Sequence, residues 1–417
     1  MPRIISFIAS LLLAALPAAA KEPSGESALL VPDYELKLLG DHAVDPATIR
    51  FRPGKGLEIR SKDKRFSLIT RVRGQFLYTL EKEAGELPEH GLQLRRARLV
   101  FAGNMFDPHV KYKVELALSP GDMAVQDGIP RRTPILDWYM DFDWLRELAL
   151  RVGQYKVPYN RQRVVSSGDL QLVDRSIANS EFNLDRDIGL DVRSTDFLGL
   201  GRLRYYAGIY IGEGRDAFRV GDLGLMYLAR VEVLPLGGFS DYVEGDFERT
   251  GPRVSLGAAY AFLDEAKGNR GILGSRPRDG GTTDYHNGTA DLVFKLYGLS
   301  LTSEIFARYG VRNPGNAEDE DGNPVPADKP RNGYGVFLQG GYMLPWLPVE
   351  VAARYSQVRP NDPARSSLAQ SEELGGGLSF YPGHHSLKVQ ADAFRIWSAG
   401  NITTGTDHFR IQLQAAL

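Results

Sequence analysis

The chain contains no cysteine among its 417 residues, which excludes disulfide bonds, thiolate nucleophiles and cysteine metal sites together. After the first twenty residues it also has no apolar run long enough for a spanning helix, so a bundle of transmembrane helices is excluded. Its 50 basic and 52 acidic residues nearly cancel, and this balance argues against nucleic acid as a partner. Any electrostatic function must therefore come from the local arrangement of charges.

Motifs of common enzymes are missing as well. The sequence has no G-x-S-x-G, no P-loop and no H-E-x-x-H. The pair His384-His385 alone does not make a metal site, and the acidic stretch 318–323 lacks the remaining ligands of a calcium-binding loop. We therefore expect no enzyme activity, no cofactor and no resident metal.

The N-terminus has the three parts of a secretory signal peptide. Residues 1–3 include a basic residue, residues 4–16 are almost continuously apolar, and residues 18–20 are alanines that suit a cleavage site. The apolar run is shorter than the ~20 residues that span a bilayer, so it does not predict a membrane anchor. We expect cleavage after Ala20, followed by a mixed periplasmic lead-in over residues 21–55.

From residue 56 to residue 417 the dominant pattern is alternation of apolar and polar residues. The final segment shows it most clearly: it places Phe409, Ile411, Leu413, Ala415 and Leu417 on one face and His408, Arg410, Gln412 and Gln414 on the other. A period of two indicates a β-strand, and the length fits a tilted transmembrane strand of ~9–11 residues.

About sixteen such segments recur, with short turns such as 296–298 and 381–384 and long polar connections at 121–133, 236–252, 265–283 and 313–332. The sequence therefore predicts an all-β protein, a single transmembrane antiparallel β-barrel. A secreted β-sandwich is the competing all-β fold, but no repeat of ~100 residues is visible. The expected strand centres lie near residues 72, 98, 114, 139, 151, 191, 206, 229, 258, 290, 304, 338, 352, 376, 391 and 411.

One long segment, residues 158–186, breaks the alternation between two well-formed strands. It is rich in arginine and contains Ser166, Ser167 and Asp169. A connection of this length in a compact domain usually has a function or is disordered. We interpret it as a loop that folds into the lumen and narrows the pore, the alternative being a mobile surface loop.

Arginine also recurs at positions that the alternation turns towards the lumen. Guanidinium groups stay charged and present paired donors that match phosphate or carboxylate oxygens, and a ring of them selects for anions. Acidic residues face inward too, among them Glu115, Asp137, Asp141 and Asp143, and could neutralise them. The candidate anion-binding and pore-lining residues are Arg71, Arg73, Arg96, Arg98, Arg151, Lys156, Arg161, Arg163, Arg175, Arg186, Arg202 and Arg204.

Several motifs in residues 56–195 resemble the phosphate-selective porin O and P family. They are Gly56-Leu57-Glu58-Ile59 through Phe66-Ser67-Leu68, Arg73-Gly74-Gln75-Phe76, Leu94-Arg95-Arg96-Ala97-Arg98 followed by Gly103, Arg151-Val152-Gly153-Gln154-Tyr155-Lys156-Val157-Pro158-Tyr159, and Asp185-Arg186-Asp187-Ile188-Gly189. Beyond residue 195 only barrel-like alternation remains.

The resemblance implies a sixteen-stranded, usually trimeric barrel of the outer membrane, with an inward third loop and an arginine ladder at the constriction. It carries over to Arg73, Arg96, Arg98, Arg151, Lys156 and Arg186, whereas Arg202 and Arg204 rest on strand facing alone. We expect a diffusion channel for small anions such as phosphate or polyphosphate, in contact with membrane lipid and lipopolysaccharide. The alternatives are a general porin of low selectivity and a structural or adhesive barrel with a blocked lumen.

Overall fold

The computed structural model describes residues 48–123, 125–126, 129–130, 133–217 and 224–417. Every described residue belongs to one compact unit, which ends at Leu417. The expected signal peptide and most of the expected lead-in therefore lie outside the described residues.

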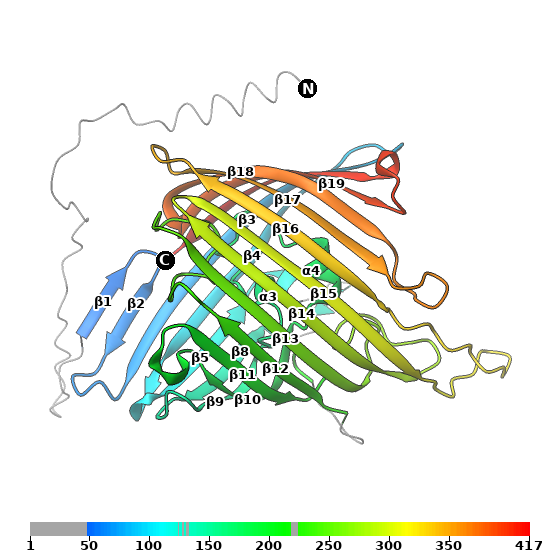
Figure 1. Ribbon diagram of the computed structural model, residues 1–417, viewed down its shortest axis with the longest axis horizontal. Coiled ribbons are helices and arrows are strands. Elements are labelled where there is room, and N and C mark those ends of the chain that lie inside the picture. Colours follow the sequence, from blue (N-terminus) through cyan, green and yellow to red (C-terminus); the bar gives the residue numbers. More distant parts are fainter. Residues whose placement is uncertain (1–47, 124, 127–128, 131–132, 218–223) are drawn as a thin grey trace. The chain divides into compact units, whose positions relative to one another are not determined.

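Sixteen antiparallel strands form one closed β-barrel, shown in Figure 1. The last strand pairs with the first, from Thr406 opposite Glu83 to Ala416 opposite Arg73, and so closes the ring. Every expected strand centre falls within one of these strands, and the predicted fold class is confirmed. The strands are β3 (Ser67–Glu83), β4 (Glu89–Met105), β5 (Asp107–Ala117), β8 (Ile135–Phe142), β9 (Ala149–Lys156), β10 (Arg186–Ser194), β11 (Leu203–Tyr210), β12 (Met226–Val233), β13 (Arg253–Ala266), β14 (Thr282–Leu296), β15 (Leu299–Asn313), β16 (Gly333–Met343), β17 (Val349–Pro360), β18 (Ser371–His385), β19 (Leu387–Ser398) and β20 (Thr406–Ala416).

The alternation in the sequence becomes an alternation of burial in the barrel. Along β12 the residues are buried and exposed in strict turn: Arg230 and Glu232 lie inside, while Tyr227, Val231 and Val233 lie outside. An outward apolar face and a polar interior are the arrangement that a membrane barrel requires, because lipid surrounds it and its lumen holds polar side chains.

A hairpin of β1 (Thr48–Arg52) and β2 (Gly56–Arg60) extends the sheet at one end of the barrel. β2 pairs with the first residues of β3, with Leu57 opposite Thr70. The chain's last residue, Leu417, donates its backbone N–H to the carbonyl of Val72 at 2.9 Å, so the hairpin continues the sheet beyond the C-terminus. The boundary that the sequence suggested after residue 55 falls in the turn of this hairpin.

The connection between β9 and β10, residues 157–185, is called the inner segment below. It contains α3 (Arg161–Val164) and α4 (Ile177–Phe182), which Figure 1 shows within the outline of the barrel. Most of its residues are buried, and α4 contacts β15, β16, β17 and β18. None of the helices in the described part of the chain is long and apolar enough to cross a membrane.

A second long connection, residues 234–252 between β12 and β13, lies at the end of the barrel that carries the short turns. Its backbone and side chains meet the inner segment: Glu244 donates its N–H to the carbonyl of Asp169 at 3.0 Å and accepts from the N–H of Gln171 at 2.8 Å. Two inward connections, one from each end, therefore meet inside the barrel beside the later strands. The remaining short elements are α2 (Pro120–Met123), β6 (Val125–Gln126), β7 (Ile129–Pro130), η1 (Phe197–Gly199) and η2 (Ile402–Thr404).

Candidate functional site

Two cavities lie between the inner segment and the wall formed by the early strands. The larger has a volume of about 480 Å³ and is lined mainly by strands β3 to β11, with a few residues from β18, β20 and the connection 234–252. The smaller has a volume of about 250 Å³. Arg98, Lys156 and Arg186 line both cavities. These three cations, from β4, β9 and β10, therefore mark the boundary between two neighbouring spaces.

Basic side chains outnumber acidic ones in both cavities. The larger is lined by Arg71, Arg73, Arg98, Lys113, Arg151, Lys156, Arg186 and Arg193, against Glu115, Asp137 and Asp169. The smaller is lined by Arg95, Arg96, Arg98, Lys156, Arg163, Arg175, Arg186 and Arg215, against Asp122 and Asp185. This excess gives both spaces a positive field, although the whole chain is nearly neutral.

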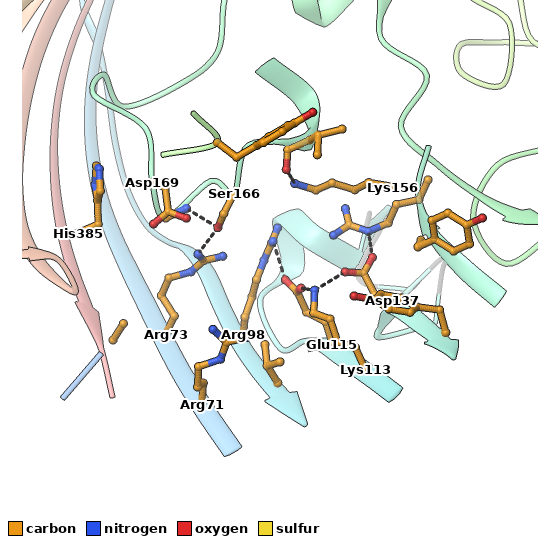
Figure 2. A pocket seen from close by; sticks show the side chains of 18 of the residues that line it. Arg71, Arg73, Arg98, Lys113, Glu115, Asp137, Lys156, Ser166, Asp169 and His385 are labelled. Carbon is orange, nitrogen blue, oxygen red and sulfur yellow. Dashed lines mark hydrogen bonds and ion pairs between the residues drawn. The ribbon is translucent and has the colours of Figure 1, made fainter. Parts of the chain in front are cut away.

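Arg71 and Arg73 line the larger cavity from β3, and the carboxylate of Asp169 attracts both of them from beyond ion-pair distance. Both project from β3, and Figure 2 shows Arg73 reaching Ser166 of the inner segment. The Arg73 guanidinium donates to the hydroxyl of Ser166 at 2.9 Å and to the hydroxyl of Ser167 at 3.2 Å. Within the described residues neither arginine forms an ion pair, and Arg71 is exposed and makes no side-chain hydrogen bond.

Two further cations are held by neutral groups only. The Lys156 ammonium donates to the backbone carbonyls of Val164 and Val165 at 3.1 and 3.2 Å. The Arg175 guanidinium donates to the carbonyls of Gln162 and Val165 at 2.7 and 2.6 Å. Burial and the neighbouring guanidinium of Arg163 hold the pKa of Arg175 well below its usual value. An anion in the smaller cavity would therefore relieve an uncompensated charge.

The other cavity arginines are neutralised at short range. Arg98 binds Glu115 and Asp122, each at 2.9 Å, and Arg186 binds Asp137 at 2.6 Å. Further pairs join Arg151 to Asp141 at 2.6 Å, Arg96 to Asp174 at 3.2 Å, and Arg163 to Asp185 through Nε at 2.7 Å. These pairs hold the lining arginines in place, and all three guanidinium nitrogens of Arg98 donate to carboxylates.

Three of the expected residues line neither of these cavities. Arg161 is buried inside the barrel, where it binds Asp291 at 2.5 Å and Asp241 at 2.9 Å. Arg204 pairs with Glu232 and with the same Asp241. Arg202 is exposed and precedes β11, which begins at Leu203. The i, i+2 spacing of Arg202 and Arg204 at β11 therefore does not place these two arginines in the cavities.

Four basic cavity residues were not among the expected ones: Arg95, Lys113, Arg193 and Arg215. Lys113 lies two residues before Glu115, and Arg193 lies two residues after Asp191, so each shares the inward face of its strand with that carboxylate. Strand periodicity was therefore a usable signal for both. Arg95 has no such signal. It is the extra residue of a β-bulge, since Gln75 pairs with Arg96 and Phe76 with Leu94. The bulge turns Arg95 and Arg96 to the same side, where both bind Asp174.

Comparison with known proteins agrees with this architecture. The profile of the family described as phosphate-selective porin O and P matches residues 71–217. Among solved structures, an anion-selective porin from Comamonas acidovorans superposes with a TM-score of 0.57 at 12% identity, covering 84% of this chain and 99% of that one. OmpF of Salmonella typhi, in complex with daunomycin, gives 0.54 at 13%, covering 89% and 100%. A loop-deletion mutant of OmpT from Vibrio cholerae gives 0.53 at 12%, covering 84% and 99%.

No curated protein matches the chain. At these levels of identity the solved structures establish the fold. The family match covers the inner segment and most, but not all, of the residues that line the two cavities.

Proposed function

We propose that this chain, an outer-membrane porin whose residues 71–217 match the phosphate-selective porin O and P family, is a diffusion channel for small anions. The observation that carries the proposal is the pair Arg71 and Arg73, two cations in the larger cavity without an ion-pair partner among the described residues. An unneutralised guanidinium in a wet lumen attracts anions and repels cations. A channel rather than an enzyme is the activity that this arrangement supports.

The two cavities would act as successive stations. An anion that leaves Arg71 and Arg73 next meets Arg98, Lys156 and Arg186, which line both spaces, and then Arg163 and Arg175 of the smaller cavity. Several weak sites in series allow an ion to enter and also to leave, which conduction requires. The guanidinium fork matches phosphate oxygens, so phosphate and polyphosphate are the anions that we propose as cargo.

The assembly that we propose is a homotrimer embedded in outer-membrane lipid and lipopolysaccharide. It follows from the family resemblance, and a porin barrel exposes an apolar outer face to lipid and to neighbouring copies. The Comamonas porin is itself described as anion-selective, which favours anions as the cargo here.

The test is single-channel recording of the full chain in a planar bilayer under a potassium chloride gradient. We expect a reversal potential that shows preference for chloride, and a chloride current that added phosphate blocks. The double variant Arg71→Gln, Arg73→Gln should weaken the phosphate block by roughly tenfold or more, because each charge-assisted hydrogen bond contributes about 1.5–3 kcal/mol.

Arg202→Gln is the matched control, since it removes an arginine that lines neither cavity. It should leave both the reversal potential and the block unchanged. Current without selectivity or block would identify a general porin of low selectivity. A protein that inserts without conducting would instead be a structural or adhesive barrel.

A further inference from the structure

One side of the larger cavity is a stack of aromatic rings and guanidinium groups. The guanidinium carbon of Arg151 lies 3.8 Å from the ring centre of Tyr139 and 5.3 Å from that of Tyr155. The guanidinium carbon of Arg193 lies 5.6 Å from Tyr155 and 5.3 Å from Tyr206. All five residues line the cavity, from strands β8, β9, β10 and β11. Ring and guanidinium thus alternate across four neighbouring strands.

The charges of this stack are already neutralised. Arg151 donates to Asp141 at 2.6 and 2.7 Å, and Arg193 donates to Asp191 at 2.6 and 2.5 Å. The hydroxyl of Tyr155 also donates to Asp191, at 2.5 Å. Because each guanidinium edge is paired, the stack offers a ligand flat ring and guanidinium surface rather than net charge. Tyr139, Arg151 and Arg193 supply that surface, since Tyr155 and Tyr206 are only 1% and 8% exposed.

Two hydroxyl groups in the stack are free to bind a ligand. Tyr139 and Tyr206 line the larger cavity, and neither hydroxyl has a hydrogen-bond partner among the described residues. Tyrosine is suited to such a place, since its ring contacts apolar groups and its hydroxyl donates to an oxygen.

The cavity arginines that form no ion pair among the described residues, Arg71 and Arg73, lie elsewhere, on β3, while the Lys156 ammonium on β9 is bound to the backbone carbonyls of the inner segment. Apolar side chains add to the lining, among them Val100, Pro158 and Val164. An inorganic anion would contact the cationic side alone. The volume of about 480 Å³ lies within the roughly 300–1,000 Å³ that is usual for sites of organic ligands.

We propose that the larger cavity binds an organic anion whose phosphate or carboxylate group is held by Arg71 and Arg73. Its flat ring lies against the accessible members of the stack, Tyr139, Arg151 and Arg193, which the buried rings of Tyr155 and Tyr206 support. The preferred class is the small aryl phosphates, with aryl carboxylates as the singly charged analogues. This inference rests on the proposed anion channel and names a cargo class for it.

The test compares two blockers of the chloride current through the full chain, phenyl phosphate and inorganic phosphate, in the same bilayer. We expect phenyl phosphate to reach half-block at a roughly tenfold lower concentration, the size of effect that ring stacking produces. In the double variant Tyr139→Leu, Tyr206→Leu, the two blockers should reach half-block at the same concentration. Tyr206→Phe keeps the ring and should keep most of the preference.

Tyr227→Leu is the matched control, because Tyr227 lies on the outer face of β12 and should change neither value. Equal half-block by both blockers in the unaltered channel overturns the ring site and leaves the anion channel intact. A preference for phenyl phosphate that survives in the double leucine variant overturns it as well. Absence of block by either compound, together with absence of anion selectivity, overturns the proposed channel itself.

A second comparison covers the case in which the leucine variants fail to assemble. In the unaltered channel benzoate should block more strongly than acetate, because the two carboxylates differ by the ring. Equal block by benzoate and acetate overturns the ring site without any variant.

Discussion

At the scale of single residues, what matters for function is whether a lumen charge has a partner. Arg98 and Arg186 are held by carboxylates at 2.9 and 2.6 Å, so they shape the wall and add little net field. Arg71 and Arg73 lack such partners within the described residues, and this is why we assign anion attraction to them. Residue type alone does not separate these two groups, since all are arginines on inward faces.

Asp169 gives a prediction at the same scale. It lines the larger cavity, and burial raises the pKa of its carboxyl group above the usual value, although Arg73 and Lys388 attract its charged form. Lowering the pH from 7 should therefore protonate Asp169 before carboxylates of ordinary pKa. Loss of this negative charge increases the net positive charge of the cavity, so the chloride preference should rise on mild acidification.

The measurement is the reversal potential under a potassium chloride gradient between pH 7 and pH 4. Asp169→Asn should show the acidic reversal potential already at pH 7. The interaction that this variant removes is on the order of 1 kcal/mol, as for two unit charges about 4 Å apart in water. Asp174→Asn is the comparison. The pKa of Asp174 is lowered by Arg96 and Arg95 despite its burial, so that group stays charged over this range. A flat profile in the unaltered protein would contradict the role given to Asp169.

At the scale of elements, the inner segment is a fixed part of the lumen. The N–H of Val173 donates to Asp392 of β19 at 3.0 Å, and the Lys388 ammonium donates to the carbonyl of Leu170 at 2.7 Å. Gln171 donates to Ser300 of β15 at 2.6 Å and to Glu350 of β17 at 2.5 Å. Contacts to strands this far apart around the ring hold the segment against the later strands and leave the cavities beside the early ones.

Arg161 is the anchor whose loss should release this element. Its side chain is 1% exposed and joins α3 to Asp291 on β14 and to Asp241 of the connection 234–252. Removing one partner of a buried ion pair costs about 3–5 kcal/mol. We expect Arg161→Met to lower thermal stability, to raise single-channel conductance and to weaken chloride preference, because the segment no longer holds its place.

Arg204→Met is the control for that prediction, since Arg204 binds the same Asp241 and, among the described residues, forms no hydrogen bond or ion pair with the inner segment. It should cost less stability and leave conductance unchanged. Thermal unfolding followed by circular dichroism and conductance in a bilayer provide the two readouts. Equal conductance in both variants would show that Arg161 does not position the segment.

At the scale of the whole molecule, the barrel separates an apolar outer face from a charged interior. The outward faces are apolar, as along β12, and arginine and carboxylate side chains are concentrated inside. The chain carries a formal charge of only −2, yet its two cavities are strongly basic. The anion selectivity that we propose would therefore come from the placement of charges within a closed ring and not from composition.

Salt should weaken this selectivity in part. The Debye length falls from about 10 Å at 0.1 M to about 3 Å at 1 M, and screening affects exposed charges far more than buried ones. Arg71 is exposed, whereas Arg96 is buried at 6% exposure. The chloride preference, measured under the same concentration ratio, should be smaller near 1 M than near 0.1 M without vanishing.

Arg71→Gln should reduce the difference in chloride preference between the two salt concentrations, because it removes an exposed charge, which salt screens most strongly. A preference that is the same at both concentrations in the unaltered channel would contradict an electrostatic origin.

The sequence by itself determined the elements of this protein. A period of two fixes which face each residue takes, so all sixteen strands could be placed, and the long break in that pattern marked the inner segment. The same periodicity identified Arg71, Arg73, Arg98 and Arg151 as inward residues, each of which lines the larger cavity.

Only the tertiary structure decided which of these charges are free. Periodicity assigns a face but no partner, and the partners come from distant parts of the chain: Arg161 meets Asp291, and Arg73 meets Ser166 and Ser167. It also decided that a bulge turns Arg95 inward beside Arg96, against strict alternation. Ion pairing depends on distances of a few ångströms between strands, and those distances exist only once the ring has closed.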